Sequence, residues 1–233
     1  MVSSAADRSP AQPANITAEQ AAKTMVSRPY ILLLVVVAIV GVVVSLAAWC
    51  FLEGIYQLDR ELYTHLPHAL GYEQGPPLWW PLPVLGIAGL VIALAIKLLP
   101  GDGGHLPAKG LAVGGKPTTS IELPGVIVAG LVAVGSGIVL GPEAPLIAIG
   151  SGGAVLLVSL GRRKTPPQAL QIIAAAGSFA ALSFIFGSPL IAAVILIEAT
   201  GIGGARLRLI LIPGLLAAGI GSLSGCTMSP ATS

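Results

Sequence analysis

The 233-residue chain is 55% hydrophobic and only 9% charged, with a formal net charge of +2 and a mean hydropathy of +0.90. A soluble domain usually has about 25% charged residues, so these values exclude an ordinary soluble enzyme, a disordered chain and a nucleic-acid binder with a basic face. They predict an all-α polytopic membrane protein. The 30 glycines and 19 prolines, about a fifth of the chain, predict broken, re-entrant helices.

Three regions are predicted from the distribution of polar residues. These are a cytosolic N-terminal tail over residues 1–28, a transmembrane region over 29–223 and a short polar tail over 224–233. Both cysteines, Cys50 and Cys226, lie in or beside apolar segments and are predicted to be packing residues that face lipid or the core.

The first two apolar runs predict membrane-crossing helices. Tyr30–Leu52 carries no charge and as a helix spans about 35 Å, enough to cross a bilayer. Residues 53–77 hold acidic residues and prolines and predict a polar loop. Trp79 and Trp80 predict an aromatic pair at the membrane surface, ahead of a second span over Leu82–Leu99.

The distribution of Lys and Arg predicts the orientation. Of the twelve Lys and Arg residues, all but Arg60 can lie on one side, so the positive-inside rule predicts a cytosolic N-terminus, in the plasma membrane. With Lys116 and Arg162 both inside, residues 121–160 must enter the membrane and return. The predicted turning point is Gly141-Pro142-Glu143-Ala144-Pro145, which places Glu143 inside the membrane.

Glu143 has the clearest functional interpretation, because a carboxylate kept at membrane depth is costly and marks a functional site. Gly141 and Pro142 end the preceding helix and Pro145 suits a first turn, so a new helix is predicted to begin at or just after Glu143. Backbone amides at Gly141, Glu143 and Ala144 then form an anion site. Glu143 can occupy these amides and swing away when an anion enters, which makes it a candidate gate. The alternative is a helix-capping glutamate in a packed turn.

Two further breaks interrupt apolar segments. Gly101–Pro107 can open a short helix with free amides or form a flexible loop. Phe186–Leu190 divides an uncharged stretch, Thr165–Ile197, that is too long for one span. Glu198 follows it, either as a plain interfacial carboxylate or as a possible proton relay. No nucleophile–base pair and no metal cluster is visible, so neither an enzyme nor a cofactor or metal site is predicted.

These breaks resemble motifs of the CLC family of chloride channels and chloride–proton exchangers, over about Leu99–Gly221. The family's G-R-E-G-P signature is similar to Gly141–Pro145, its F-N-A-P-L segment to Phe186–Leu190 and its G-S-G-I-P loop to Gly103–Pro107. The resemblance implies a voltage-gated-type channel or exchanger: a membrane homodimer whose subunits each consist of two inverted halves and carry their own chloride path.

Carried over residue by residue, the resemblance implies that Glu143 is the gating glutamate. It also implies a chloride site of backbone amides, those of Gly141, Glu143, Ala144, Gly104, His105, Leu106 and Pro107. Gly104 replaces the family's serine, with His105 beside it. The family's proton-relay glutamate falls on Ala199, one residue past Glu198, which favours passive conduction unless Glu198 substitutes for it.

The length of the chain limits this interpretation. The family's second half supplies a G-x-F-x-P loop and a tyrosine that have no counterpart after Leu223, so the chain resembles the N-terminal half of a CLC protein: a truncated reading frame, a gene fragment or a half-unit. The expected partners are chloride, the lipid bilayer, and a second copy or a missing second half. Two other functions stay open: a non-conducting assembly or regulatory half-subunit, and a transporter of another small anion such as nitrate or fluoride.

Overall fold

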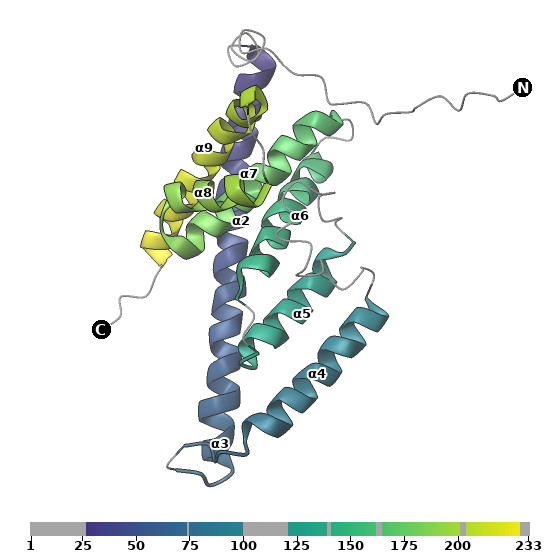
Figure 1. Cartoon of the computed structure of the whole chain (residues 1–233), viewed down its shortest axis with the longest axis vertical. Coiled ribbons are helices and arrows are strands. Elements are labelled where there is room, and N and C mark those ends of the chain that lie inside the picture. Colours follow the sequence, from purple (N-terminus) through teal and green to yellow (C-terminus); the bar gives the residue numbers. More distant parts are fainter. Residues whose placement is uncertain are drawn as a thin grey trace, which may run out of the picture.

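The computed structural model describes residues 27–73, 75–99, 121–138, 141–161, 165–200 and 204–228, with side chains given for all of these except 199, 200, 204–209 and 224–228. The described residues form helices and turns, and no strand (Figure 1). The helices are α2 (Arg28–Arg60), the π-helix η1 (Glu61–His65), α3 (Leu66–Ala69), α4 (Pro81–Leu98), α5 (Leu123–Gly135), α6 (Glu143–Gly161), α7 (Pro167–Phe186), α8 (Pro189–Thr200) and α9 (Gly204–Met228).

The predicted all-α polytopic membrane fold is confirmed. Within the described residues, four helical segments are long and apolar enough to cross a membrane: the continuous segment α2–η1–α3, α4, α6 and α7. Helix α5 has 13 residues and is therefore about 20 Å long, too short to cross a hydrocarbon core of about 30 Å by itself. It runs antiparallel to α6, because Leu123 lies against Gly152 while Gly130 lies against Pro145.

The predicted polar loop over residues 53–77 is wrong for its first 17 residues. The first helix continues through η1 and α3 to Ala69, so that the whole helical segment has 42 residues. Side-chain pairs one turn apart support the extension: the Gln57 amide donates to Glu53 (2.7 Å), and His65 Nδ1 lies 3.7 Å from Glu61 Oε1. Glu53, Asp59 and Glu61 therefore lie on the helical segment rather than in a loop, while Glu73 lies beyond α3.

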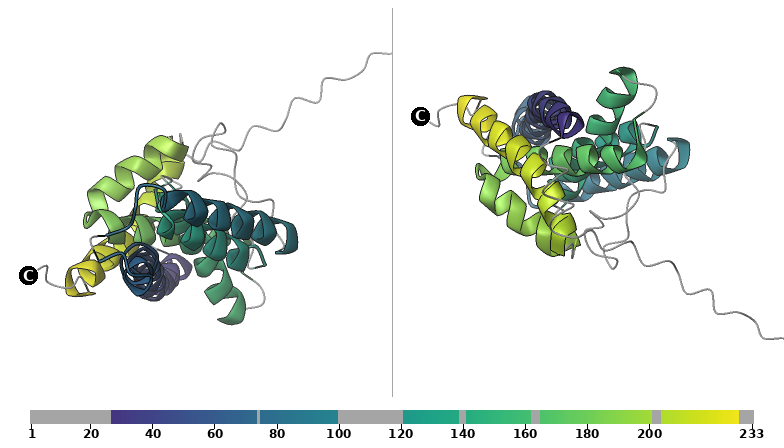
Figure 2. Two further views of the ribbon diagram at one scale, coloured as in Figure 1. Left: turned by 90° about the horizontal axis from the view of Figure 1, so that it is seen from below. Right: turned by 90° about the horizontal axis from the view of Figure 1, so that it is seen from above.

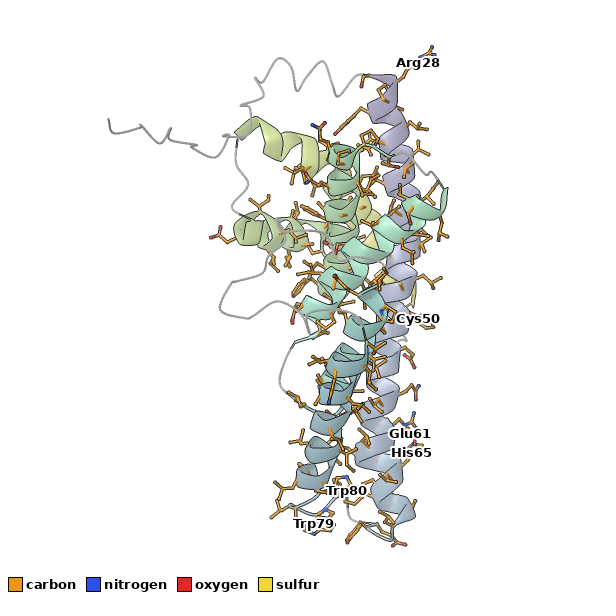
Figure 3. The ribbon with its side chains drawn as sticks, turned by 90° about the vertical axis from the view of Figure 1, so that its right-hand side faces the viewer. Arg28, Cys50, Glu61, His65, Trp79 and Trp80 are labelled. Carbon is orange, nitrogen blue, oxygen red and sulfur yellow. The ribbon has the colours of Figure 1, made fainter. Side chains whose placement is uncertain are left out.

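The aromatic pair after this segment holds the return of the chain. Trp80 is buried and its indole N–H donates to the carbonyl of Leu62 in η1 (3.0 Å), whereas Trp79 is half exposed. Tyr72 makes edge contacts with both rings. Both tryptophans lie at the far end of the long helical segment from Arg28 (Figure 3). Trp80 is thus a packing residue of the fold, and Trp79 keeps the exposure that a membrane-surface aromatic needs.

Helix α7 is the centre of the bundle and contacts α2, α6, α8 and α9. Its middle section, 176–183, is buried throughout. The approach to α6 is so close that a Cβ on Gly150 would lie 2.5 Å from the carbonyl oxygen of Gly177. Small residues permit such backbone contact between membrane helices, where packing rather than hydrophobic burial drives association.

Hydroxyl groups add polar links between the same helices. Ser183 of α7 donates to the carbonyl of Ala218 in α9 (2.6 Å), and Ser178 reaches the carbonyl of Ile147 in α6 (3.3 Å). On the other side of α9, Gly41 of α2 lies against Ala217. A Cβ added at Gly41 would lie 3.3 Å from the Cα of Ala217. Helices α2, α6, α7 and α9 thus form one tightly packed unit.

The remaining apolar surface lies outside this unit. Seen end-on, α4 and α5 extend to one side of α2 and α9 lies on the other (Figure 2). Helix α4 exposes most of its side chains, including Leu82, Ile87, Leu90, Leu94 and Leu98. Cys50, predicted to face lipid or the core, is also exposed on α2. A bilayer or another protein surface must cover these faces.

The contact between α6 and α7 predicts a sharp difference between two glycines of α6. We expect Gly150→Ala to lower the melting temperature by about 2–12 °C, since overpacking costs about 1–3 kcal/mol in a well-packed site. Gly153→Ala should change it by less than about 2 °C, because the nearest atom to its added Cβ is 4.0 Å away. Thermal unfolding of the two variants in detergent measures this; equal melting temperatures would contradict the packing.

Candidate functional site

The turn between α5 and α6 begins with a regular helix ending. The N–H of Ile138 bonds to the carbonyl of Ala133, and the N–H of Gly137 to that of Val134, which is the Schellman pattern. Gly137 has a φ of +84°, where glycine carries no Cβ penalty. This ending stops α5 at Gly135, ahead of Gly141 and Pro142, which were predicted to end the helix.

Helix α6 begins at Glu143, as predicted. The carbonyl of Pro142 accepts its first hydrogen bond, from the N–H of Leu146 (3.0 Å). The first four residues at a helix start have no intrahelical partner for their N–H groups, and in α6 these are residues 142–145. Two of the four are prolines, which have no N–H. Only Glu143 and Ala144 therefore offer backbone donors at this positive helix end.

The Glu143 side chain folds back over its own helix start. A Cβ on Gly141 would lie 2.8 Å from Oε1 of Glu143 and closer still to the rest of the carboxylate. The side chain is half-buried, and no described Lys, Arg or His lies within ion-pair distance of it. The carboxylate thus lies at the helix end without a described cationic partner, close over the backbone of Gly141.

Packing of α6 on α2 and α5 fixes where the start of α6 lies along the apolar run of α2. A Cβ on Gly130 of α5 would lie 2.7 Å from Pro145 and 3.3 Å from the ring of Phe51 in α2. Phe51 is the last residue but one of the uncharged run Tyr30–Leu52. Helix α6 therefore starts close to the end of that apolar run where the chain turns acidic, rather than at its middle.

The extension of α2 also holds this region, a role that the sequence analysis missed. Leu58 packs against Gly135 at the end of α5, where a Cβ added at Gly135 would lie 2.8 Å from the Leu58 side chain. The Tyr63 hydroxyl donates to the carbonyl of Ser136 (2.8 Å). The signal was present in the sequence, because Phe51, Ile55 and Leu58 recur at helical spacing.

The other predicted site residues do not join Glu143 in the described part of the chain. The break at 187–189 is confirmed: Gly187 has a φ of +61°, and Ser188 Oγ accepts from the N–H of Ile191 (3.5 Å). The following helix, α8, packs against α7 and α9, and Glu198 near its end is exposed. Four predicted anion-site residues lie outside the described residues, namely Gly104, His105, Leu106 and Pro107.

Metal ligands do not gather in this region. Within the described ranges, no three His, Cys, Asp or Glu side chains lie close enough together to hold an ion. The chemistry that the geometry offers at the start of α6 is thus that of two backbone donors, a helix end and one carboxylate.

Comparison with known proteins finds relatives with a transport-related name. The chain is 33% identical over 172 residues to the protein named "Putative ion-transport protein YfeO" in Escherichia coli O6:H1 strain CFT073, and equally to its namesakes in Escherichia coli strain SE11 and Shigella boydii serotype 4 strain Sb227. Each match covers 72% of this chain but only 39% of the relative, so the chain spans about two fifths of the length of these proteins. No protein-family model matches the chain.

The predicted membership in the CLC family is wrong by these findings. The relatives are named for ion transport without mention of CLC or chloride, and no family model supports the assignment. The motifs that carried it, at Gly141–Pro145 and Phe186–Leu190, are five residues long each. Glycine and proline at a helix start are what any interrupted membrane helix requires, so these motifs do not identify a family.

The contact of Pro145 with α5 predicts that Gly130 controls the position of the α6 start. We expect Gly130→Ala to lower the melting temperature by several degrees, because the added methyl group meets Pro145 and Phe51, which cannot both move away. Gly86→Ala and Gly89→Ala in α4 are matched controls, since nothing lies within 4 Å of an added Cβ at either position. A Gly130→Ala protein as stable as the two controls would disprove the contact.

Proposed function

We propose that this protein takes part in the transport of ions across a membrane. Two independent observations support the proposal: helices long and apolar enough to cross a bilayer, and relatives at 33% identity that are named as ion-transport proteins. The proposed location is the plasma membrane with a cytosolic N-terminus, since all but one of the Lys and Arg residues can lie on one side.

The proposed substrate is a small anion, with chloride as the first candidate. The start of α6 carries the argument: the N–H groups of Glu143 and Ala144 have no intrahelical partner, and they lie at the positive end of a 19-residue helix. Backbone donors bind an anion without a fixed cation, which favours release as well as entry. Nitrate and fluoride share this chemistry and remain part of the substrate test.

Glu143 is the proposed gate. Its carboxylate lies over Gly141 at the start of the same helix, from where it can compete with an anion for the positive helix end. Rotation of the side chain away from Gly141, or its protonation, removes that competition. Because the helix begins near the acidic end of the α2 apolar run, the gate faces the proposed outer side.

Passive conduction is proposed rather than proton coupling. Glu198 is exposed near the end of α8, and α8 packs against α7 and α9 rather than against the start of α6. A proton relay needs titratable groups or waters in series between two carboxylates. The packing of α8 therefore supports Glu198 as an interfacial carboxylate.

A second candidate function is a non-conducting membrane subunit that assembles with another chain or with a second copy. The exposed apolar side of α4 favours it, because another membrane chain can cover this side. Transport by the purified chain alone distinguishes the two functions.

The test is anion efflux from liposomes that contain the purified protein. We expect chloride efflux above that of empty liposomes, and a rate several-fold higher in Glu143→Ala, since the competing carboxylate is gone. Glu143→Gln should behave similarly, because the neutral amide keeps the size but loses the charge. Glu73→Gln, a change of the same kind in an exposed residue beyond α3, should match the wild type.

Three outcomes separate the alternatives. Efflux equal to empty liposomes would contradict conduction by this chain and support the subunit function. Efflux that neither Glu143 variant changes would contradict the gate. Exchange of internal chloride for nitrate or fluoride defines the substrate, and uphill chloride movement driven by a pH gradient would contradict passive conduction.

A further inference from the structure

The extension of the first helix touches the end of α5 through two side chains, Leu58 and Tyr63. The phenol O–H of Tyr63 donates to the carbonyl of Ser136 across 73 residues of sequence, at 2.8 Å, and Ser136 is buried. The same oxygen of Tyr63 lies 3.4 Å from the position of an added Cβ on Gly137. Tyr63 thus bonds to the residue that follows the last residue of α5 and lies beside the glycine of the Schellman turn.

Helix α5 packs against the start of α6, so a shift at the end of α5 can be transmitted to α6. Gly130, less than two turns before Ser136, lies against Pro145, two residues after Glu143. Because α5 is a short helix of 13 residues, a shift at its end moves Gly130 as well. The position of the Glu143 backbone therefore depends on how α5 is held.

The π-helix explains how Tyr63 reaches this turn. Residues 61–65 have the wider π spacing, which is rare and rotates the side chains that follow relative to a plain α-helix. The carbonyl of Leu62 in the same segment receives the Trp80 indole N–H (3.0 Å), so the returning chain fixes the π-helix from outside. Figure 3 shows Trp80 close to Glu61 and His65 at this end of the helix.

We propose that Tyr63 is a positioning residue that holds the Glu143 gate in its closed arrangement through the end of α5. The proposal rests on the proposed function of Glu143. Loss of the Tyr63–Ser136 hydrogen bond frees the end of α5, and the start of α6 then departs more often from the arrangement with the carboxylate over Gly141. The segment that η1, α3 and Trp80 form is accordingly an outer control element of the gate.

The first test is a double-mutant cycle on efflux. We expect Tyr63→Phe to raise efflux about two- to tenfold, because it removes one ordinary hydrogen bond from the closed arrangement of the gate. The same change should have no effect in a Glu143→Ala background. Tyr56→Phe is the matched control, because Tyr56 is 58% exposed on the same helix and loses the same hydroxyl. The same fold-change in both backgrounds would show a general structural effect and overturn the proposal.

Gly137→Ala tests the contact between Tyr63 and the α5 turn by a change in the turn. Its φ of +84° disfavours alanine, and the added methyl group faces the Tyr63 hydroxyl, so the turn is strained. We expect increased efflux, with no further increase when Tyr63→Phe is added. Fully additive effects of the two changes on efflux would contradict the proposal that both act on Glu143 through the same contact.

A second readout does not depend on transport. Carbodiimide coupling of glycine ethyl ester to Glu143, followed by mass spectrometry of the peptide, reports how accessible the carboxylate is. We expect faster labelling in Tyr63→Phe and Gly137→Ala than in wild type or Tyr56→Phe. If wild-type efflux equals background but labelling changes in this way, the proposed function fails while the positioning role stands; unchanged labelling overturns the positioning role.

Discussion

The backbones of α6 and α7 meet at Gly150 and Gly177, and the geometry of the candidate site depends on this contact. A side chain at either glycine would collide with the other helix, so the crossing point is fixed to within a residue. Because α7 is itself held by α2 and α9, the axis of α6 is fixed relative to the whole unit. That axis brings Pro145 against Gly130, which also lies beside Phe51, and Glu143 to the end of the first apolar run.

The two prolines flanking Glu143 give the helix start its chemical character. They leave two backbone donors where a helix normally offers four, and these belong to Glu143 and the exposed Ala144. A site of this size suits a small anion better than a phosphate group, which is usually bound by several N–H groups in a row. With the carboxylate of Glu143 over Gly141, we propose that ligand and gate compete for one position and that a change of side-chain rotamer switches between them.

Local chemistry was predictable from the sequence, and contacts distant in sequence were not. The helix start at Glu143 was predicted correctly from Gly141, Pro142 and Pro145, and the break at 187–189 from its glycine and proline, since these residues act through their own backbone. The charges of 53–69 were mistaken for a loop signal, although Ile55, Leu58 and Leu62 continue the helical spacing. The Tyr63–Ser136 hydrogen bond depends on that helix and on a non-local approach, and the family assignment relied on motifs too short to carry it.

The central claim is that an anion and the Glu143 carboxylate compete for the amides at the start of α6. An experimental structure of the Glu143→Gln protein in bromide tests it most directly, because anomalous scattering identifies bromide without ambiguity. We expect a bromide ion within hydrogen-bonding distance of the Ala144 N–H, and a weaker peak or none there in the wild type. Bromide bound only elsewhere, or equally in both proteins, would contradict it.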